Sequence, residues 1–99
     1  MQFFIVENKK DHLTRLKARL NARYPAASIW PKNNRVFTQW DKVTNELEAN
    51  TEDTFDLVVI LDLSLDDEVS RTSVGVDQAS VLRSLRPNAT FIAYTQYPD

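Results

Sequence analysis

Short apolar runs bounded by polar residues occur at three places in the chain. Gln2–Val6, Leu57–Asp62 and Thr90–Tyr94 are predicted to be strands. The first two runs are continuously apolar, which is typical of strands that are covered on both faces in a parallel sheet. A fourth and weaker strand is predicted at Ala27–Trp30.

Between these runs, apolar residues recur at spacings of three and four, which is the period of an amphipathic helix. Asp11 is predicted to cap the first helix, which ends before Pro25. Gly75, the only glycine, is predicted to precede the third helix in a backbone conformation that other residues avoid, and Pro87 ends that helix. The three apolar stripes are Leu13, Leu16, Leu20 and Tyr24; Val36, Trp40, Val43 and Leu47; and Val76, Ala79, Leu82 and Leu85.

Strands and helices therefore alternate along the whole chain, in the order β-α-β-α-β-α-β. This alternation predicts an α/β fold with a doubly wound parallel sheet and helices on both faces. Right-handed crossovers predict the strand order 2-1-3-4, in which the first strand lies between the second and the third. Because no linker or repeat divides the chain, residues 1–99 are predicted to form one domain.

The composition sets limits on class and location. Hydrophobic residues make up 42% and charged residues 26% of the chain, as in ordinary globular proteins. The absence of cysteine excludes disulfides and thiolate metal sites. The longest strictly apolar run, Leu57–Leu61, is far shorter than the roughly 20 residues of a membrane helix, and no signal peptide is evident. A cytoplasmic location is therefore expected.

Charge is unevenly distributed, although the net charge is only −2. Residues 1–42 carry nine lysines and arginines against three acids, whereas residues 43–99 carry three against eleven. The basic residues fall mostly on the first predicted helix and the loop after it, without interleaved aromatic residues. A solvated helix face explains this pattern better than a nucleic-acid site does, so nucleic acid is not an expected partner.

Candidate chemistry lies at the carboxyl ends of the predicted strands. Glu7 follows the first strand, Asp62 ends the third and Thr95 follows the fourth. The first and third strands are neighbours in a doubly wound sheet, so the two carboxylates are expected to face one crevice. Carboxylates suit Mg²⁺, a carboxylate beside Mg²⁺ can attack phosphorus, and a threonine hydroxyl can bind a phosphoryl oxygen. Each residue alone also has a structural explanation, because polar residues are common where strands leave a sheet.

Other polar and aromatic residues are given plainer interpretations. Leu63–Val74 is predicted to be a long polar loop, and loops of this length are usually functional or mobile. His12, the only histidine, is expected at the surface, and both tryptophans are expected to be packing residues. The acids of the loop are interpreted as a solvated run: Asp66, Asp67 and Glu68.

The order and spacing of these segments resemble the receiver domains of two-component response regulators. The resemblance covers nearly the whole chain through four short motifs: Phe3–Glu7 with Asn8 (first strand and acidic pair), Leu57–Asp62 with Leu63 (third strand and phosphoacceptor), Gly75–Arg83 (glycine and third helix) and Thr90–Thr95 (fourth strand and switch residue).

This resemblance implies a flavodoxin-like sheet and a set of roles. Asp62 would accept a phosphoryl group from a histidine kinase, and Thr95 would sense it. The positions that would hold Mg²⁺ are Glu7, Asn8, Asp62 and, through its carbonyl, Ser64.

The chain also departs from the family's pattern. Asn8 stands where the family has its second acid, which removes a charge from the metal site. The loop before Gly75 is longer than usual, and no proline follows the phosphoacceptor. The printed sequence ends after the fourth strand, so the fifth strand, the family's lysine and its dimerisation helix have no counterpart. We therefore expect a truncated or degenerate receiver with weak Mg²⁺ binding.

These features favour a non-enzymatic signalling module that acts mainly through protein–protein contacts, with a histidine kinase or another signalling protein as partner. The edge strand Thr90–Tyr94 carries no charge or proline, so it is expected to form a homo-oligomer or to be completed by another segment. The alternative is a metal-dependent nucleic-acid enzyme of the Toprim type. Phe4–Glu7 resembles the opening strand and glutamate of that family. Against it, Asp62–Ser64 supplies only one acid of that family's Asp-x-Asp.

Overall fold

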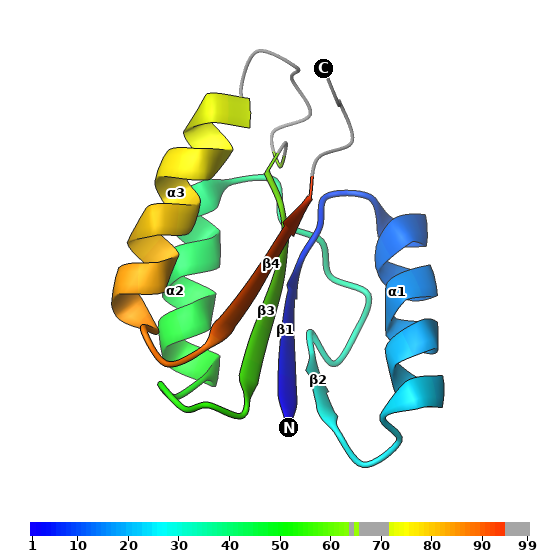
Figure 1. The fold of residues 1–99 in the computed structure, drawn as a ribbon. Helices are drawn as coiled ribbons and strands as arrows, with labels where there is room; N and C mark the ends of the chain where they lie inside the picture. Colours follow the sequence, from blue (N-terminus) through cyan, green and yellow to red (C-terminus); the bar gives the residue numbers. More distant parts are fainter. Residues whose placement is uncertain (64, 66–71, 95–99) are drawn as a thin grey trace.

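The computed structural model describes residues 1–63, 65 and 72–94, with the backbone alone described for residues 72–74. Four strands alternate with three helices along the described chain (Figure 1). None of the described helices is long and apolar enough to cross a membrane. The elements are β1 (Gln2–Val6), α1 (Lys10–Arg23), β2 (Ser28–Trp30), α2 (Trp40–Asn50), β3 (Leu57–Asp62), α3 (Thr72–Leu85) and β4 (Thr90–Tyr94).

The described strands form one parallel sheet in the order β2-β1-β3-β4. The predicted fold class is therefore confirmed: the protein has a flavodoxin-like, doubly wound α/β fold. β1 pairs with β3 over five residue positions, from Gln2 opposite Leu57 to Val6 opposite Leu61. Since every residue of β1 after Gln2 is buried, the central strand is covered on both faces, as its continuous apolar run predicts.

The helices cover the two faces of the sheet unequally. α1 lies on one face, and α2 and α3 lie side by side on the other (Figure 1). Because successive side chains of a strand point to opposite faces, β1 contributes Phe3 and Ile5 to the α1 side and Phe4 and Val6 to the other. An aromatic cluster on the α2 side includes Trp30, which stacks on Phe4 at 4.6 Å between ring centroids. This contact confirms the predicted packing role of Trp30.

The start of α1 differs from the prediction. Asp11 is not the cap, because the helix begins at Lys10 and the capping position is held by Lys9, which makes no side-chain capping bond. Asp11 instead lies in the first turn, where its negative charge interacts favourably with the helix dipole. An acidic residue near a helix start is compatible with both positions, so the sequence pattern cannot distinguish them.

Each of the three predicted apolar stripes is too long by one residue. Tyr24 is the C-cap residue after α1 and is 38% exposed. Val36 lies outside α2 and is 36% exposed, while the next residue, Phe37, is buried in its place. Val76 belongs to α3 but is 51% exposed. The remaining stripe residues of α2 and α3 do pack on the sheet, so the helix period is correct and only the first residue of each of these two stripes is wrong.

Gly75 lies inside α3 and not before it, and its backbone does not adopt a positive φ. The predicted loop is also shorter, because residues 72–74 belong to the helix. The reason for glycine is a close approach of two backbones. A β-carbon at this position would run into the carbonyl group of Leu63, with 2.8 Å to its α-carbon. Glycine therefore allows the start of α3 to lie against the chain that leaves β3.

Gly75→Ala is expected to lower the free energy of unfolding by about 1 kcal/mol. Alanine favours a helix interior over glycine by about 1 kcal/mol, but overpacking against a backbone carbonyl costs about 2 kcal/mol. Chemical denaturation of the variant measures the balance. Ser80→Ala, at an exposed position of the same helix, is the matched control and should be neutral or slightly stabilising. A Gly75→Ala variant that is more stable than the parent protein would contradict the close approach.

Candidate functional site

Glu7 is a buried acid at the point where β1 leads into α1, with a side chain only 2% exposed. The backbone N–H groups of Asn8 and Lys9 donate hydrogen bonds to its Oε2 atom, at 2.7 and 3.2 Å. The turn between strand and helix thus folds back on the carboxylate. A buried carboxylate requires such donors, since leaving it without them would be strongly destabilising.

The other oxygen of Glu7 faces two side chains. The Tyr94 hydroxyl at the end of β4 donates to Glu7 Oε1 at 2.7 Å. His12 Nδ1, from the first turn of α1, lies 3.4 Å from the same oxygen. His12 is expected at the surface. Its ring is half-exposed, but it also contacts the buried acid, so the expectation describes only part of its environment. One carboxylate joins β1, α1 and β4.

Asp62 is fully buried at the carboxyl end of β3. Val6 lies opposite Leu61 across the β1–β3 pair, so Glu7 and Asp62 follow at the adjacent ends of the two strands. On its other side Asp62 lies opposite Tyr94 in the β3–β4 pair. The strand order reverses between β1 and β3, which is the place where doubly wound sheets bind ligands. The predicted proximity of the two acids at this edge follows directly from the confirmed topology.

Burial and the two nearby acids favour the protonated form of Tyr94. Burial, the hydrogen bond to Glu7 and the negative charges of Glu7 and Asp62 all raise the pKa of Tyr94 well above its usual range. The phenol is therefore a permanent hydrogen-bond donor at neutral pH. It provides for Glu7 the kind of charge-assisted contact that is shorter and stronger than a neutral hydrogen bond.

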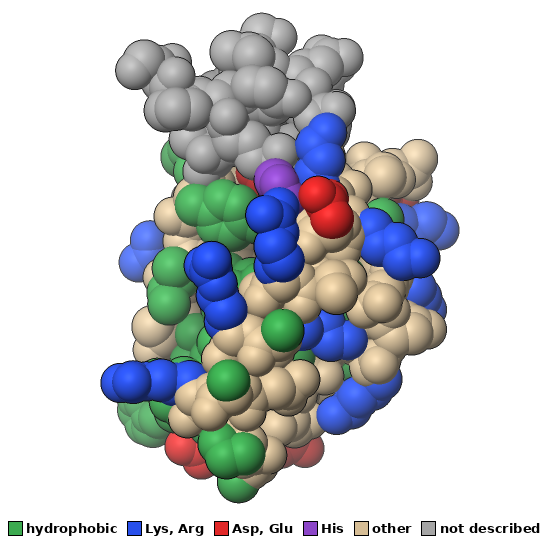
Figure 2. All heavy atoms as spheres, turned by 90° about the vertical axis from the view of Figure 1, so that its right-hand side faces the viewer, with side chains coloured by type: hydrophobic (Ala, Val, Ile, Leu, Met, Phe, Trp, Pro, Cys, Tyr) green, Lys and Arg blue, Asp and Glu red, His purple; other side chains and the backbone are tan. Residues whose placement is uncertain are grey.

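A shallow cleft of about 350 Å³ opens beside this group, between α1 and the sheet. Its inner end is formed by Glu7 and Tyr94, and its outer wall by Arg15 and Arg19 of α1. Figure 2 shows this face, where lysine and arginine side chains are spread over α1 between neutral ones. The cleft that reaches Glu7 is thus bordered by basic side chains.

Glu7 has hydrogen-bond donors on both of its carboxylate oxygens. Each carboxylate oxygen can accept more than one contact, so these donors compete with a cation for Glu7 but do not exclude it. No group of three or more histidine or acidic side chains in the described ranges is placed to hold a metal ion. Asn8 contributes its backbone N–H to Glu7.

The structure brings together Glu7 and Asp62 of the predicted site, together with the backbone of Asn8. The predictions for Ser64, Thr95 and the acids of the loop (Asp66, Asp67 and Glu68) lie outside the described residues. Sequence reasoning missed Tyr94, one position before the threonine that it selected. Strand alternation is the signal that could have found it. Tyr94 lies two residues after Ile92, so both side chains are on the side of the sheet where Ile60 packs, and Tyr94 ends its strand beside two acids.

No protein-family model, curated protein or solved structure matches the chain.

Proposed function

We propose that this chain is a receiver-like signalling module that acts mainly through protein contacts, with Asp62 as its phosphoacceptor. The observation that carries the proposal is the placement of Asp62 and Glu7 at adjacent strand ends, where the sheet order reverses. A carboxylate at such a place can attack an activated phosphoryl group to form an acyl phosphate. The partner supplying that group would be a histidine kinase or another signalling protein.

The phosphoryl chemistry of this module would be weak. Asn8 supplies no second negative charge, and Glu7 is held by Tyr94 and by backbone donors, so Mg²⁺ would bind poorly. Asp62 is also fully buried, which limits the approach of a small phosphodonor. These features support a role in which protein contacts, and not rapid phosphoryl turnover, transmit the signal.

The basic surface of α1 does not favour the nucleic-acid alternative. Its charges are dispersed over the helix face (Figure 2), and Arg15 pairs with Asp11 of the same helix at 3.5 Å. Phosphate recognition by a protein uses positive charge that faces one path along the nucleic acid. A non-enzymatic role therefore explains this face more simply.

Incubation with acetyl phosphate and Mg²⁺ is expected to phosphorylate Asp62 in only a small fraction of molecules. Intact-mass spectrometry measures the fraction, and peptide mapping after borohydride trapping of the acyl phosphate locates it. Asp62→Asn should abolish the label, while Asp53→Asn, at an acid near the opposite, amino ends of β3 and β4, should leave it unchanged.

The outcomes separate the parts of the proposal. Stoichiometric labelling of Asp62 would contradict the weakened chemistry. Labelling that persists in Asp62→Asn, or no label at any phosphodonor concentration, would remove Asp62 as phosphoacceptor. Mg²⁺-dependent cleavage of DNA that is lost in Glu7→Gln would overturn the signalling proposal in favour of the enzyme alternative.

A further inference from the structure

β4 is the least covered strand of the sheet. Within the described part of the chain, β3 is its only strand neighbour. Ile92 is 51% exposed and Phe91 is only partly buried, whereas β1 and β3 are almost wholly buried. Exposed apolar surface along an edge strand is typical of a surface that binds another chain.

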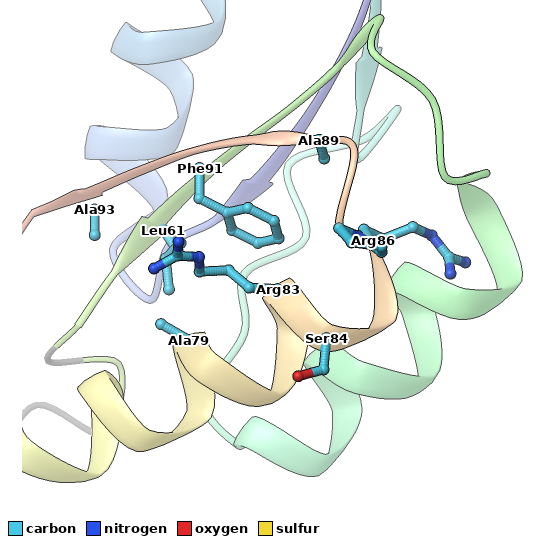
Figure 3. Close-up of a pocket in the computed structure, with 9 residues that line it drawn as sticks. Leu61, Ala79, Arg83, Ser84, Arg86, Ala89, Phe91 and Ala93 are labelled. Atoms are coloured by element: carbon cyan, nitrogen blue, oxygen red, sulfur yellow. The ribbon is translucent and has the colours of Figure 1, made fainter.

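An open groove of about 630 Å³ runs along this strand on the α3 side. Figure 3 shows α3 as one wall, with Ala79 and Arg83, and the strands as the floor, with Leu61, Phe91 and Ala93. The floor is entirely apolar. Since Ala93 is exposed, the groove extends to the edge of the sheet.

Arg83 gives the groove a positive charge. Its side chain extends from α3 across the groove toward Leu61, whereas Arg86 points the other way, toward α2 (Figure 3). Arg86 is engaged by backbone carbonyls, including that of Thr51 at 3.0 Å, but Arg83 makes no ion pair or hydrogen bond with the described residues. None of the described residues that line the groove is acidic. An acid on an occupant would therefore meet an available cation.

The small side chains in the groove allow a helix to approach closely. A helix packs 8–10 Å from its neighbour when the side chains between them are small. Ala79 on the wall and Ala93 on the floor are small, and Ser84 is the next groove residue along α3. A helix lying beside α3 would continue the helical layer that α2 and α3 already form on this face (Figure 1).

We infer that the groove between α3 and β4 binds an amphipathic helix of a partner protein, whose apolar face covers Phe91 and whose flanking acids pair with Arg83. The inference rests on the interaction role proposed above but not on phosphorylation of Asp62. Recognition of a helix in a groove uses apolar anchors for affinity, and charge at the rim selects the partner.

The same charges disfavour a second copy of this chain as the occupant. On the other side of β4, the cleft is walled by Arg15 and Arg19. If two copies paired symmetrically through their β4 edges, the two grooves would lie on the same side of the joined sheet, or each groove would lie on the side of the other copy's cleft. Where two grooves meet in such a pairing, Arg83 would lie beside Arg83 of the other copy, and this like-charge contact opposes association.

The test uses two synthetic helical peptides of about 18 residues, which is within the usual length of a globular helix. They share one leucine and alanine face, flanked by glutamates in one peptide and by lysines in the other. Titrated into the ¹⁵N-labelled chain, the glutamate peptide is expected to shift the amide signals of Ala79, Ser84, Phe91 and Ala93. It should bind about tenfold more tightly than the lysine peptide.

Charge reversal supplies the controls. Arg83→Glu should reverse the preference between the peptides, whereas Arg23→Glu, the same charge change in the last turn of α1, should leave it unchanged. Binding is measured without a phosphodonor or Mg²⁺, so failure of the phosphoacceptor proposal would not affect this result. Equal binding of both peptides, shifts outside the groove or no saturable binding would overturn the inference. A concentration-dependent dimer that Ile92→Lys abolishes would overturn it in favour of a second copy.

Discussion

Tyr94→Phe is expected to lower the free energy of unfolding by about 2 kcal/mol, although only one oxygen atom is removed. That oxygen carries the hydroxyl that donates to the buried Glu7 carboxylate at 2.7 Å. Hydrogen bonds to charged groups contribute about 1.5–3 kcal/mol, and a buried acceptor that loses its donor carries the full loss of solvation. Urea denaturation of the two proteins measures the difference. Tyr24→Phe, at an exposed tyrosine, should change stability little.

A double-mutant cycle attributes the loss to the contact with Glu7. In a Glu7→Gln background the acceptor is neutral, so Tyr94→Phe should destabilise by less than about 1 kcal/mol. The difference between the two values is the coupling energy between the phenol and the carboxylate. If Tyr94→Phe costs the same in both backgrounds, the loss comes from packing and not from the hydrogen bond.

The same pair predicts a dependence on alkaline pH. The pKa of Tyr94 is raised in the folded chain, so above about pH 10 the unfolded chain loses this proton and the folded chain keeps it. Because the unfolded state then binds fewer protons, stability falls as pH rises, by at most about 1.4 kcal/mol per pH unit. The contribution is fully present below pH 10. The difference in stability between parent and Tyr94→Phe should therefore shrink above pH 10, and a constant difference would contradict the raised pKa.

The sequence predicts the sheet better than it predicts the helix starts. β1 and β3 are recognisable because strands covered on both faces require uninterrupted apolar side chains, and alternation with helices then determines a parallel order. The stripe residues Val36 and Val76 satisfy the helical period equally well, yet they lie where the helix or the packed face has not begun. Periodicity identifies a face but contains no information about the residue at which contact with the sheet begins.

The candidate site shows the same division. Glu7 and Asp62 could be found because a strand end is a position in the sequence and the strand order follows from connectivity. Their partners could not be found in this way. Tyr94 reaches Glu7 across β3, and His12 reaches it from α1, so both contacts depend on side-chain direction and length. Gly75 is a similar case, because its role depends on how closely α3 approaches Leu63.

Arg86→Ala is expected to be the most destabilising of these substitutions, by about 3 kcal/mol. Arg86 follows α3 and closes the end of α2, where helix carbonyls lack partners within the helix. Its Nε atom donates to the Thr51 hydroxyl and Nη2 to the Thr51 carbonyl, both at 3.0 Å, and Nη2 also lies 3.4 Å from the carbonyls of Leu47 and Glu48. Thr51 is buried, so these acceptors would be left without a charged donor in a site that water reaches poorly.

Two further variants separate the geometry of Arg86 from its charge. Arg86→Lys keeps the charge but not the planar fork of donors, so it should recover less than half of the loss. Arg83→Ala removes an arginine three residues earlier, from the open groove, and should change the free energy of unfolding by no more than about 0.5 kcal/mol. Denaturation midpoints and slopes for the three variants measure these differences. If Arg86→Lys is as stable as the parent chain, general attraction between a positive charge and the carbonyl end of α2 is sufficient, and the fork of hydrogen bonds does not join α3 to α2.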